Sequence, residues 1–167
     1  MVVEDGTGVA GADSYVTVEF ADGYFLSRGI PGWGDLDGEQ KEQCLVRATD
    51  YVDSMFQWRG RSMTETQSLR FPRSGLRDYE GREVTGVPVA LMQSVCDVAL
   101  LASGGAELFQ TMDPSGRVVS ERIGDLSFTY ERGPDGRTLY ESVNARLRGL
   151  YKDTGRAAMI TGRVERV

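Results

Sequence analysis

Residues 89–102 form a nearly continuous apolar stretch with only three polar interruptions. Pro88 precedes the stretch, where proline favours a helix start, and the pair Gly104-Gly105 follows it as a stop signal. A helix that is apolar almost all round must be covered on every side. At about 1.5 Å per residue the stretch is too short to cross a bilayer. It therefore predicts a central helix at 88–102, inside a helical bundle or under a partner.

Two segments before this stretch carry helix start signals. Thr17 is a candidate N-cap for a first helix, which the glycines near residue 30 would end. Asp37 and Gln40 form a capping-box pattern at the start of a longer amphipathic helix. The expected apolar face of that helix comprises Cys44, Leu45, Ala48, Tyr51, Val52 and Met55.

Two more capping-box patterns and a change of period complete the expected elements. Thr64 to Gln67 predicts one or two helical turns before Pro72, and Thr138 to Glu141 predicts a last helix. Between them, apolar and polar residues alternate over about 117–131, on both sides of the pair Gly124-Asp125. This alternation predicts a β-hairpin with a tight turn.

The two ends of the chain lack any apolar period. We therefore expect a mainly α fold, a small helical bundle with a β-hairpin insertion and extended N- and C-terminal arms. A length of 167 residues suits one domain, which we place at 1–151, with an extended tail at 152–167. No apolar stretch reaches the roughly 18 residues of a membrane span, and no leader pattern begins the chain. We expect a protein made in the cytoplasm, without a membrane partner.

The composition argues against catalysis. The sequence contains no histidine, and Cys44 and Cys96 stand alone on apolar faces, where small core residues are the simplest interpretation. Acidic pairs at helical spacing, such as Asp50 and Asp53, are typical of a solvated surface. We expect no enzyme activity, no metal and no other cofactor. A net charge of −6 also argues against broad, non-specific binding to nucleic acid.

Basic and aromatic residues alternate between residues 56 and 82, where the local charge is positive. The candidate contacts with a second subunit or with nucleic acid are Trp58, Arg59, Arg61, Arg70 and Arg73. Aromatic rings can stack on bases while arginine binds phosphate. The alternative is a structural loop, with arginine stacked on Trp58 or Phe71 and paired with acids from residues 35–53.

Short motifs in a fixed order resemble a phage family of DnaT-like single-stranded DNA-binding proteins. They are VEDGTG at 3–8, ADSYV at 12–16, ATDYVD at 48–53, WRG at 58–60 and QSLRFPR at 67–73. VSERIGD at 119–125, followed by FTY at 128–130, is similar to the family's hairpin segment. The family's tryptophan before Pro72 is Phe71 here. The resemblance covers roughly residues 3–150 and implies single-stranded DNA binding in phage replication.

The layout of helical bundle, hairpin and C-terminal tail also resembles head–tail connector (adaptor) proteins of tailed phages. That resemblance implies a structural virion protein of the neck, a homo-oligomeric, dodecameric ring under the portal that joins capsid to tail. Its partners would be sister subunits, the portal, other neck or tail proteins, and genomic double-stranded DNA passing through the channel. The tail residues expected to dock on the portal are Arg156, Met159, Ile160, Arg163, Val164 and Arg166. We take the adaptor interpretation first, because the chain is acidic, and single-stranded DNA binding as the alternative.

Overall fold

The computed structural model describes residues 1–109, 120–123, 126–132 and 138–152, with the backbone alone at 120–123, 126–132 and 138–139. The helices are α1 (Val18–Leu26), the 3₁₀ turn η1 (Pro31–Trp33), α2 (Gly38–Met55), α3 (Val89–Ser103) and α4 (Glu141–Leu147). The strands are β1 (Arg61–Ser62), β2 (Arg73–Ser74), β3 (Ser120–Ile123), β4 (Leu126–Arg132) and β5 (Thr138–Tyr140). The fold is mainly helical, as expected.

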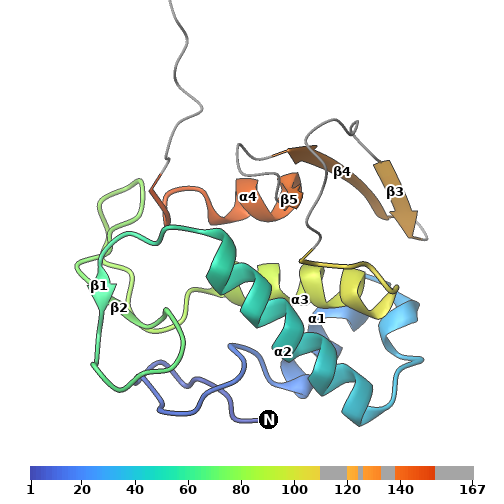
Figure 1. Ribbon diagram of the computed structural model, residues 1–167, viewed down its shortest axis with the longest axis horizontal. Coiled ribbons are helices and arrows are strands. Elements are labelled where there is room, and N and C mark those ends of the chain that lie inside the picture. The colour runs from blue at the N-terminus through green and yellow to red at the C-terminus, as the bar shows by residue number, and fades with distance from the viewer. Residues whose placement is uncertain (110–119, 124–125, 133–137, 153–167) are drawn as a thin grey trace, which may run out of the picture.

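Helix α3 is the central element. It packs most extensively against α2 and also contacts α1 and α4 (Figure 1). Val95, Cys96, Val98 and Leu101 of α3 are completely buried. The prediction of a covered apolar helix is confirmed, and the cover comes from the chain itself. None of the described helices is both long and apolar enough to cross a membrane.

The two N-terminal helices begin at the predicted residues. The Thr17 hydroxyl accepts a 3.1 Å hydrogen bond from the Phe20 amide at the start of α1. At the start of α2, Asp37 Oδ1 accepts from the Gln40 amide at 2.8 Å, and Gln40 Oε1 accepts from the Asp37 amide at 3.0 Å. These bonds satisfy backbone donors that have no partner inside the helix.

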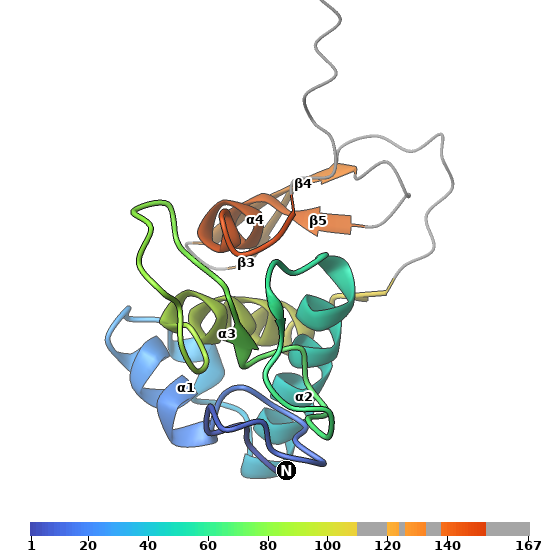
Figure 2. The ribbon, with the colours of Figure 1, turned by 90° about the vertical axis from the view of Figure 1, so that its left-hand side faces the viewer.

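Helix α4 and a three-stranded antiparallel sheet form a second layer beside the α1–α3 bundle (Figures 1 and 2). The β3–β4 pair, with Ile123 opposite Leu126, confirms the predicted hairpin strands, while residues 117–119 and 124–125 lie outside the described residues. The capping box predicted at Thr138 is wrong. Residues 138–140 form β5 instead and pair with β4, so α4 begins only at Glu141, with no side-chain cap.

The helical turns predicted after Thr64 are also absent. Both capping-box hydrogen bonds form, from the Thr64 amide to Gln67 Oε1 at 2.9 Å and from the Gln67 amide to the Thr64 hydroxyl at 3.1 Å. The Gln67 amide group then donates to the carbonyl oxygens of Leu69 and Pro72. These two carbonyl oxygens accept hydrogen bonds from the Gln67 side chain and not from backbone amides of a helix. The segment therefore closes into a loop.

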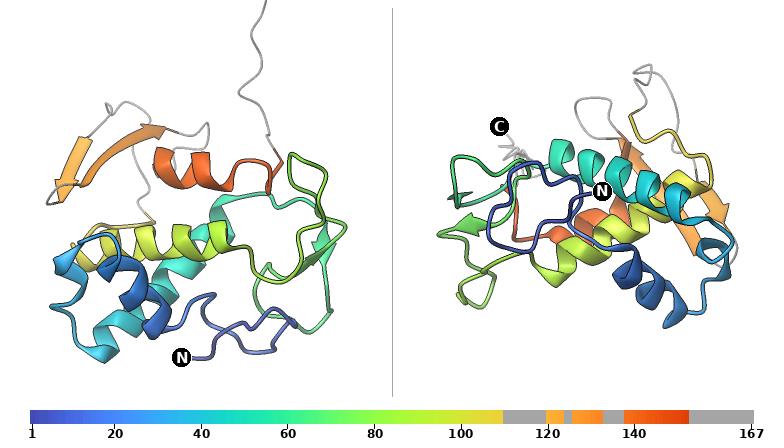
Figure 3. Two further views of the ribbon diagram at one scale, coloured as in Figure 1. Left: turned by 180° about the vertical axis from the view of Figure 1, so that it is seen from behind. Right: turned by 90° about the horizontal axis from the view of Figure 1, so that it is seen from below.

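The N-terminal segment is a closed loop rather than an extended arm (Figure 3). Val3 bridges to Ser14, and the Glu4 carboxylate is buried inside the loop. It accepts hydrogen bonds from the amides of Gly6 and Gly8 at 2.9 Å and of Val9 at 2.8 Å. The C-terminal arm lies outside the described residues from 153 onward. The predicted portal-docking residues all fall there, namely Arg156, Met159, Ile160, Arg163, Val164 and Arg166.

Candidate nucleic-acid interface

The aromatic residues of the 56–82 segment anchor it to the bundle. Trp58 lies between Phe56 and Phe71, with ring-centroid distances of 5.3 Å and 5.0 Å. Only 6% of Trp58 is exposed, and its indole N–H has no hydrogen-bond partner. The expectation that Trp58 contacts a base needs an exposed ring, and the structure places this ring in the core instead.

The arginines of the segment divide into one structural residue and several exposed ones. Arg73 donates hydrogen bonds to the carbonyl oxygens of Arg59, Gly60 and Arg70, so its guanidinium holds the loop together. The structural alternative predicted carboxylate partners for these arginines, and for Arg73 the described partners are carbonyl oxygens. Arg59, Arg61 and Arg70 are exposed.

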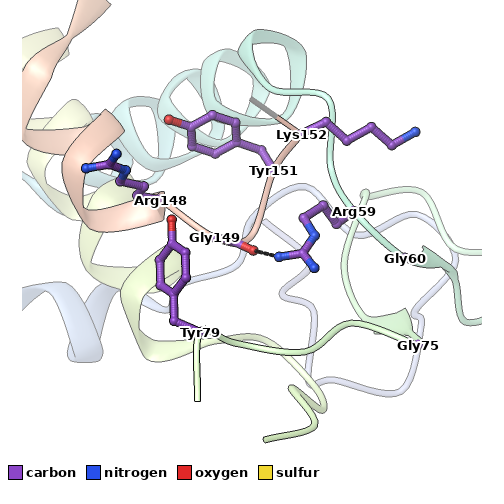
Figure 4. A pocket seen from close by; sticks show the side chains of 8 residues that line it. All are labelled: Arg59, Gly60, Gly75, Tyr79, Arg148, Gly149, Tyr151 and Lys152. Carbon is purple, nitrogen blue, oxygen red and sulfur yellow. Dashed lines mark hydrogen bonds between the residues drawn. The ribbon is translucent and has the colours of Figure 1, made fainter. Parts of the chain in front are cut away.

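A cationic groove opens where this segment meets the chain after α4. Its volume is about 550 Å³. The lining residues are Arg59, Gly60, Gly75, Tyr79, Arg148, Gly149, Tyr151 and Lys152 (Figure 4). The lining thus combines three cations with two tyrosines and includes no carboxylate. Of the predicted contact residues, only Arg59 lies in this cationic groove.

Hydrogen bonds between two distant segments build the floor of the groove. The Arg59 amide donates to the Leu150 carbonyl oxygen at 2.9 Å, and the Lys152 amide donates to the Gln57 carbonyl oxygen at 2.7 Å. The Arg59 side chain also donates to the Gly149 carbonyl oxygen at 2.7 Å (Figure 4). This pairing brings the cations of residues 59, 148 and 152 to one surface.

Tyr79 stands at the tip of a tight turn on one wall of the groove. It is 72% exposed, although it is a large aromatic residue. Its ring lies against Gly149, where a Cβ atom would come within 2.7 Å of Cε2. Gly149 has φ +95°, a conformation that other residues rarely adopt. Gly149 therefore leaves room for the Tyr79 ring, which packs directly against it.

Two buried polar networks lie elsewhere in the bundle. Tyr15 donates to Asp53 Oδ1 at 2.6 Å, and the Arg70 amide donates to Asp53 Oδ2 at 2.9 Å. Burial raises the pKa of Asp53 and of Tyr15. Asp53 is therefore not a solvated surface acid, as its helical spacing had suggested, but a structural acceptor that holds the amide of Arg70.

The second network joins three helices. Tyr24 on α1 donates to Asp97 Oδ1 at 2.7 Å, and Arg146 on α4 donates to Asp97 Oδ2 at 2.6 Å. The Arg28 guanidinium lies 3.6 Å from the centroid of the Tyr24 ring. Burial raises the pKa of Asp97 and raises the pKa of Tyr24 to about 12.

Among the described residues, the cysteines and the acidic side chains do not form an arrangement typical of a reactive centre. Cys44 and Cys96 are both buried, as expected for core residues, and burial raises the pKa of Cys96 to about 12. In the described part of the chain no three residues of the His, Cys, Asp and Glu types gather into a metal-binding cluster.

Sequence reasoning missed most of the groove. Tyr79 belonged to the alternating aromatic block, but Arg148, Tyr151 and Lys152 were assigned to a helix end and a tail. The available signal was the basic character of residues 146–152, which contain two arginines, a lysine and no acid. This basic stretch does not indicate which segment forms the other side of the groove, because that segment begins about ninety residues earlier in the chain.

Comparison with known proteins gives a match to a protein family. No curated protein and no solved structure matches the chain significantly. A family described as "Putative DnaT-like ssDNA binding protein" matches residues 1–167. This match overturns the head–tail adaptor interpretation, which was wrong, and the ring, portal and neck partners attached to it have no support. Because the match extends over the whole sequence, the chain belongs to this DnaT-like family.

Proposed function

We propose that this protein binds single-stranded DNA and that the cationic groove is the contact surface. The observation that carries the proposal is the meeting of Arg59, Arg148 and Lys152 with an exposed tyrosine, Tyr79, in one cavity. Cations that follow the phosphates, combined with aromatic rings that stack on bases, are the usual elements of single-strand binding. The family description, which names binding to single-stranded DNA, supports the same function.

The acidic composition of the chain is compatible with this proposal. The first 56 residues hold eleven acids and three basic residues, so the negative charge is concentrated in the N-terminal part. Charges more than about 8 Å away are largely screened at physiological ionic strength. The residues that line the groove include three cations and no carboxylate, so the lining charges closest to a bound phosphate are positive. We expect modest affinity that weakens steeply with salt.

We also propose that the protein is a binding protein rather than an enzyme. The absence of histidine supports this proposal, as do the two buried thiols, whose raised pKa values keep them protonated near neutral pH.

The test is fluorescence anisotropy with a labelled oligothymidine, measured at several salt concentrations. Three phosphate contacts predict that log K falls against log salt with a slope of about −2. Arg148→Gln and Lys152→Gln should each weaken binding severalfold and reduce the slope by about 0.7, because each removes one phosphate partner.

Arg47→Gln is the matched control. Arg47 is exposed on α2, outside the groove, and its replacement changes the net charge by the same amount. Its affinity should stay close to that of the wild type. Binding too weak to detect at low salt would refute the function. Equal losses in the groove variants and in Arg47→Gln would refute the groove as the site.

A further inference from the structure

We infer that Tyr79 stacks on one unpaired base in the cationic groove, so that the ligand is a short single-stranded segment of one base with its flanking phosphates. This inference rests on the proposed function and deepens it, because it names the residue that would distinguish single strands from duplex. In a duplex the base faces are already stacked on their neighbours, and only an unpaired base can offer its face to a side chain.

The turn that carries Tyr79 is rigidly built. Asp78 Oδ1 accepts hydrogen bonds at 2.9 Å from the amides of Glu80 and Arg82. The Asp78 amide donates to the Arg82 carbonyl oxygen at 3.0 Å, and Arg77 donates to the Gly81 carbonyl oxygen at 2.7 Å. The backbone on both sides of Tyr79 is therefore fixed before any ligand arrives. A ring held in this way loses little conformational entropy on binding.

The acidic charges beside Tyr79 are partly neutralised. Asp78 and Glu80 flank the tyrosine, and either carboxylate would repel a nearby phosphate. Arg82 forms ion pairs with both of them, at 2.8 Å to Asp78 and 3.0 Å to Glu80. One guanidinium offsets one of the two carboxylates, so the neighbourhood of the ring is less acidic than its sequence suggests, and the three cations that line the groove outnumber the carboxylate that remains.

The contact with Gly149 orients the Tyr79 ring toward the groove (Figure 4). Tyr79 rests on Gly149, which is joined through its carbonyl oxygen to Arg59. Arg148 immediately precedes Gly149 in the chain, so the aromatic ring and two cations are coupled through one glycine (Figure 4). A base stacked on Tyr79 would place its phosphates within the set of cations that lines the same groove.

The other aromatic residues of this region are less suited to stacking. Trp58 and Phe71 are buried in the core, and Tyr151 is half-buried, with its hydroxyl bonded to the Asn144 side chain. Phe109 is 56% exposed, but it lies beyond the end of α3, contacts Tyr51 of α2 and does not line the groove. Tyr79 is therefore the more exposed of the two tyrosines that line the groove.

The test compares Tyr79→Leu, Tyr79→Phe and the control Phe109→Leu in binding to a single-stranded oligonucleotide and to a blunt-ended, fully paired duplex. Each variant is first checked for an unchanged melting temperature. Tyr79→Leu should weaken single-strand binding by roughly 5- to 150-fold, the range expected for one lost stacking contact. Tyr79→Phe and Phe109→Leu should bind within about twofold of the wild type, because the ring is kept in the first and lies elsewhere in the second. Affinity for the duplex should not change in any variant.

A single 2-aminopurine in the oligonucleotide provides a second readout, because stacking quenches its fluorescence. Quenching should occur with the wild type and with Tyr79→Phe and be lost with Tyr79→Leu. If Tyr79→Leu binds and quenches like the wild type, the stacking inference is wrong while single-strand binding stands. If the wild type binds no single strand at all, the proposed function itself fails, and the inference fails with it.

Discussion

The Arg59 guanidinium donates a 2.7 Å hydrogen bond to the carbonyl oxygen of Gly149, a residue ninety positions later in the chain. The bond joins the loop after α2 to the segment that follows α4. Gly149 in turn supports the ring of Tyr79. Three segments that are distant in sequence thus meet at one glycine, and the cationic groove depends on that meeting.

Gly149→Ala should therefore displace the Tyr79 ring and distort the groove. Its φ of +95° is strained for alanine, and the new Cβ would lie 2.7 Å from the Tyr79 ring, so the ring must move. We expect a loss of about 1–3 kcal/mol in unfolding free energy and weaker binding to single-stranded DNA. Urea denaturation and anisotropy titration measure the two effects.

The same substitution at Gly23 serves as the control. Gly23 is exposed within α1, and a Cβ there meets no atom within 4 Å. Gly23→Ala should stabilise the helix by about 0.5–1 kcal/mol and leave DNA binding unchanged. A stabilised Gly149→Ala protein would contradict the packing described for Tyr79.

Val95→Asp should unfold the protein. Val95 is completely buried in α3, and an aspartate there would leave a charge in the core without a partner. Val89, the first residue of the same helix, is 60% exposed, and an aspartate there faces the positive end of the helix dipole. Val89→Asp should change the melting temperature by only a few degrees. Circular dichroism melts of the two variants compare them directly, and a folded Val95→Asp protein would contradict the central placement of α3.

Glu4→Gln should destabilise the N-terminal loop. The buried Glu4 carboxylate accepts three backbone amide hydrogen bonds, and a glutamine would turn its own N–H donors toward one of those amides. We expect a loss of about 1–3 kcal/mol, the usual cost of leaving a buried polar group unpaired. Glu65→Gln, at an exposed site, should lie within about 0.5 kcal/mol of the wild type. Similar denaturation midpoints for the two variants would show that the amides find other partners.

Asp97 should make stability depend on pH in a defined direction. Burial raises its pKa in the folded state despite the nearby Arg146 and Arg28, so the folded protein binds the proton more tightly than the unfolded chain. The stabilisation from this group is complete below the ordinary aspartate pKa of about 4 and is lost as the pH rises through the raised folded value. Asp97→Asn, which stays neutral, lacks this dependence. The unfolding free energy of the wild type, relative to that of Asp97→Asn, should therefore decrease from pH 4 to pH 7 in urea denaturation. If the difference instead increases with pH, the ion pair with Arg146 outweighs burial and lowers the pKa of Asp97 in the folded state.

The local signals in the sequence predicted the helices and the hairpin strands well. The caps at Thr17 and Asp37 and the apolar period of α3 act over a few residues, so their consequences follow from the adjacent sequence. The pattern at Thr64 predicted its two hydrogen bonds correctly and its helix wrongly. The difference arises because Gln67 bonds to the carbonyls of Leu69 and Pro72, and this loop closure is not contained in the four-residue motif.

The sequence alone determined that this chain is mainly helical, that its core centres on α3, and that its motifs resemble those of the DnaT-like family. These properties depend on residue order and on hydrophobic period, which are local. Tertiary structure alone decided that Trp58 is buried while Tyr79 is exposed, and that Arg59 lies beside Gly149. Both rings belong to the same stretch of alternating basic and aromatic residues, and the local sequence does not distinguish the buried ring from the exposed one. Only the long-range packing that closes the 57–59 and 150–152 segments against each other selects which ring and which cations face solvent.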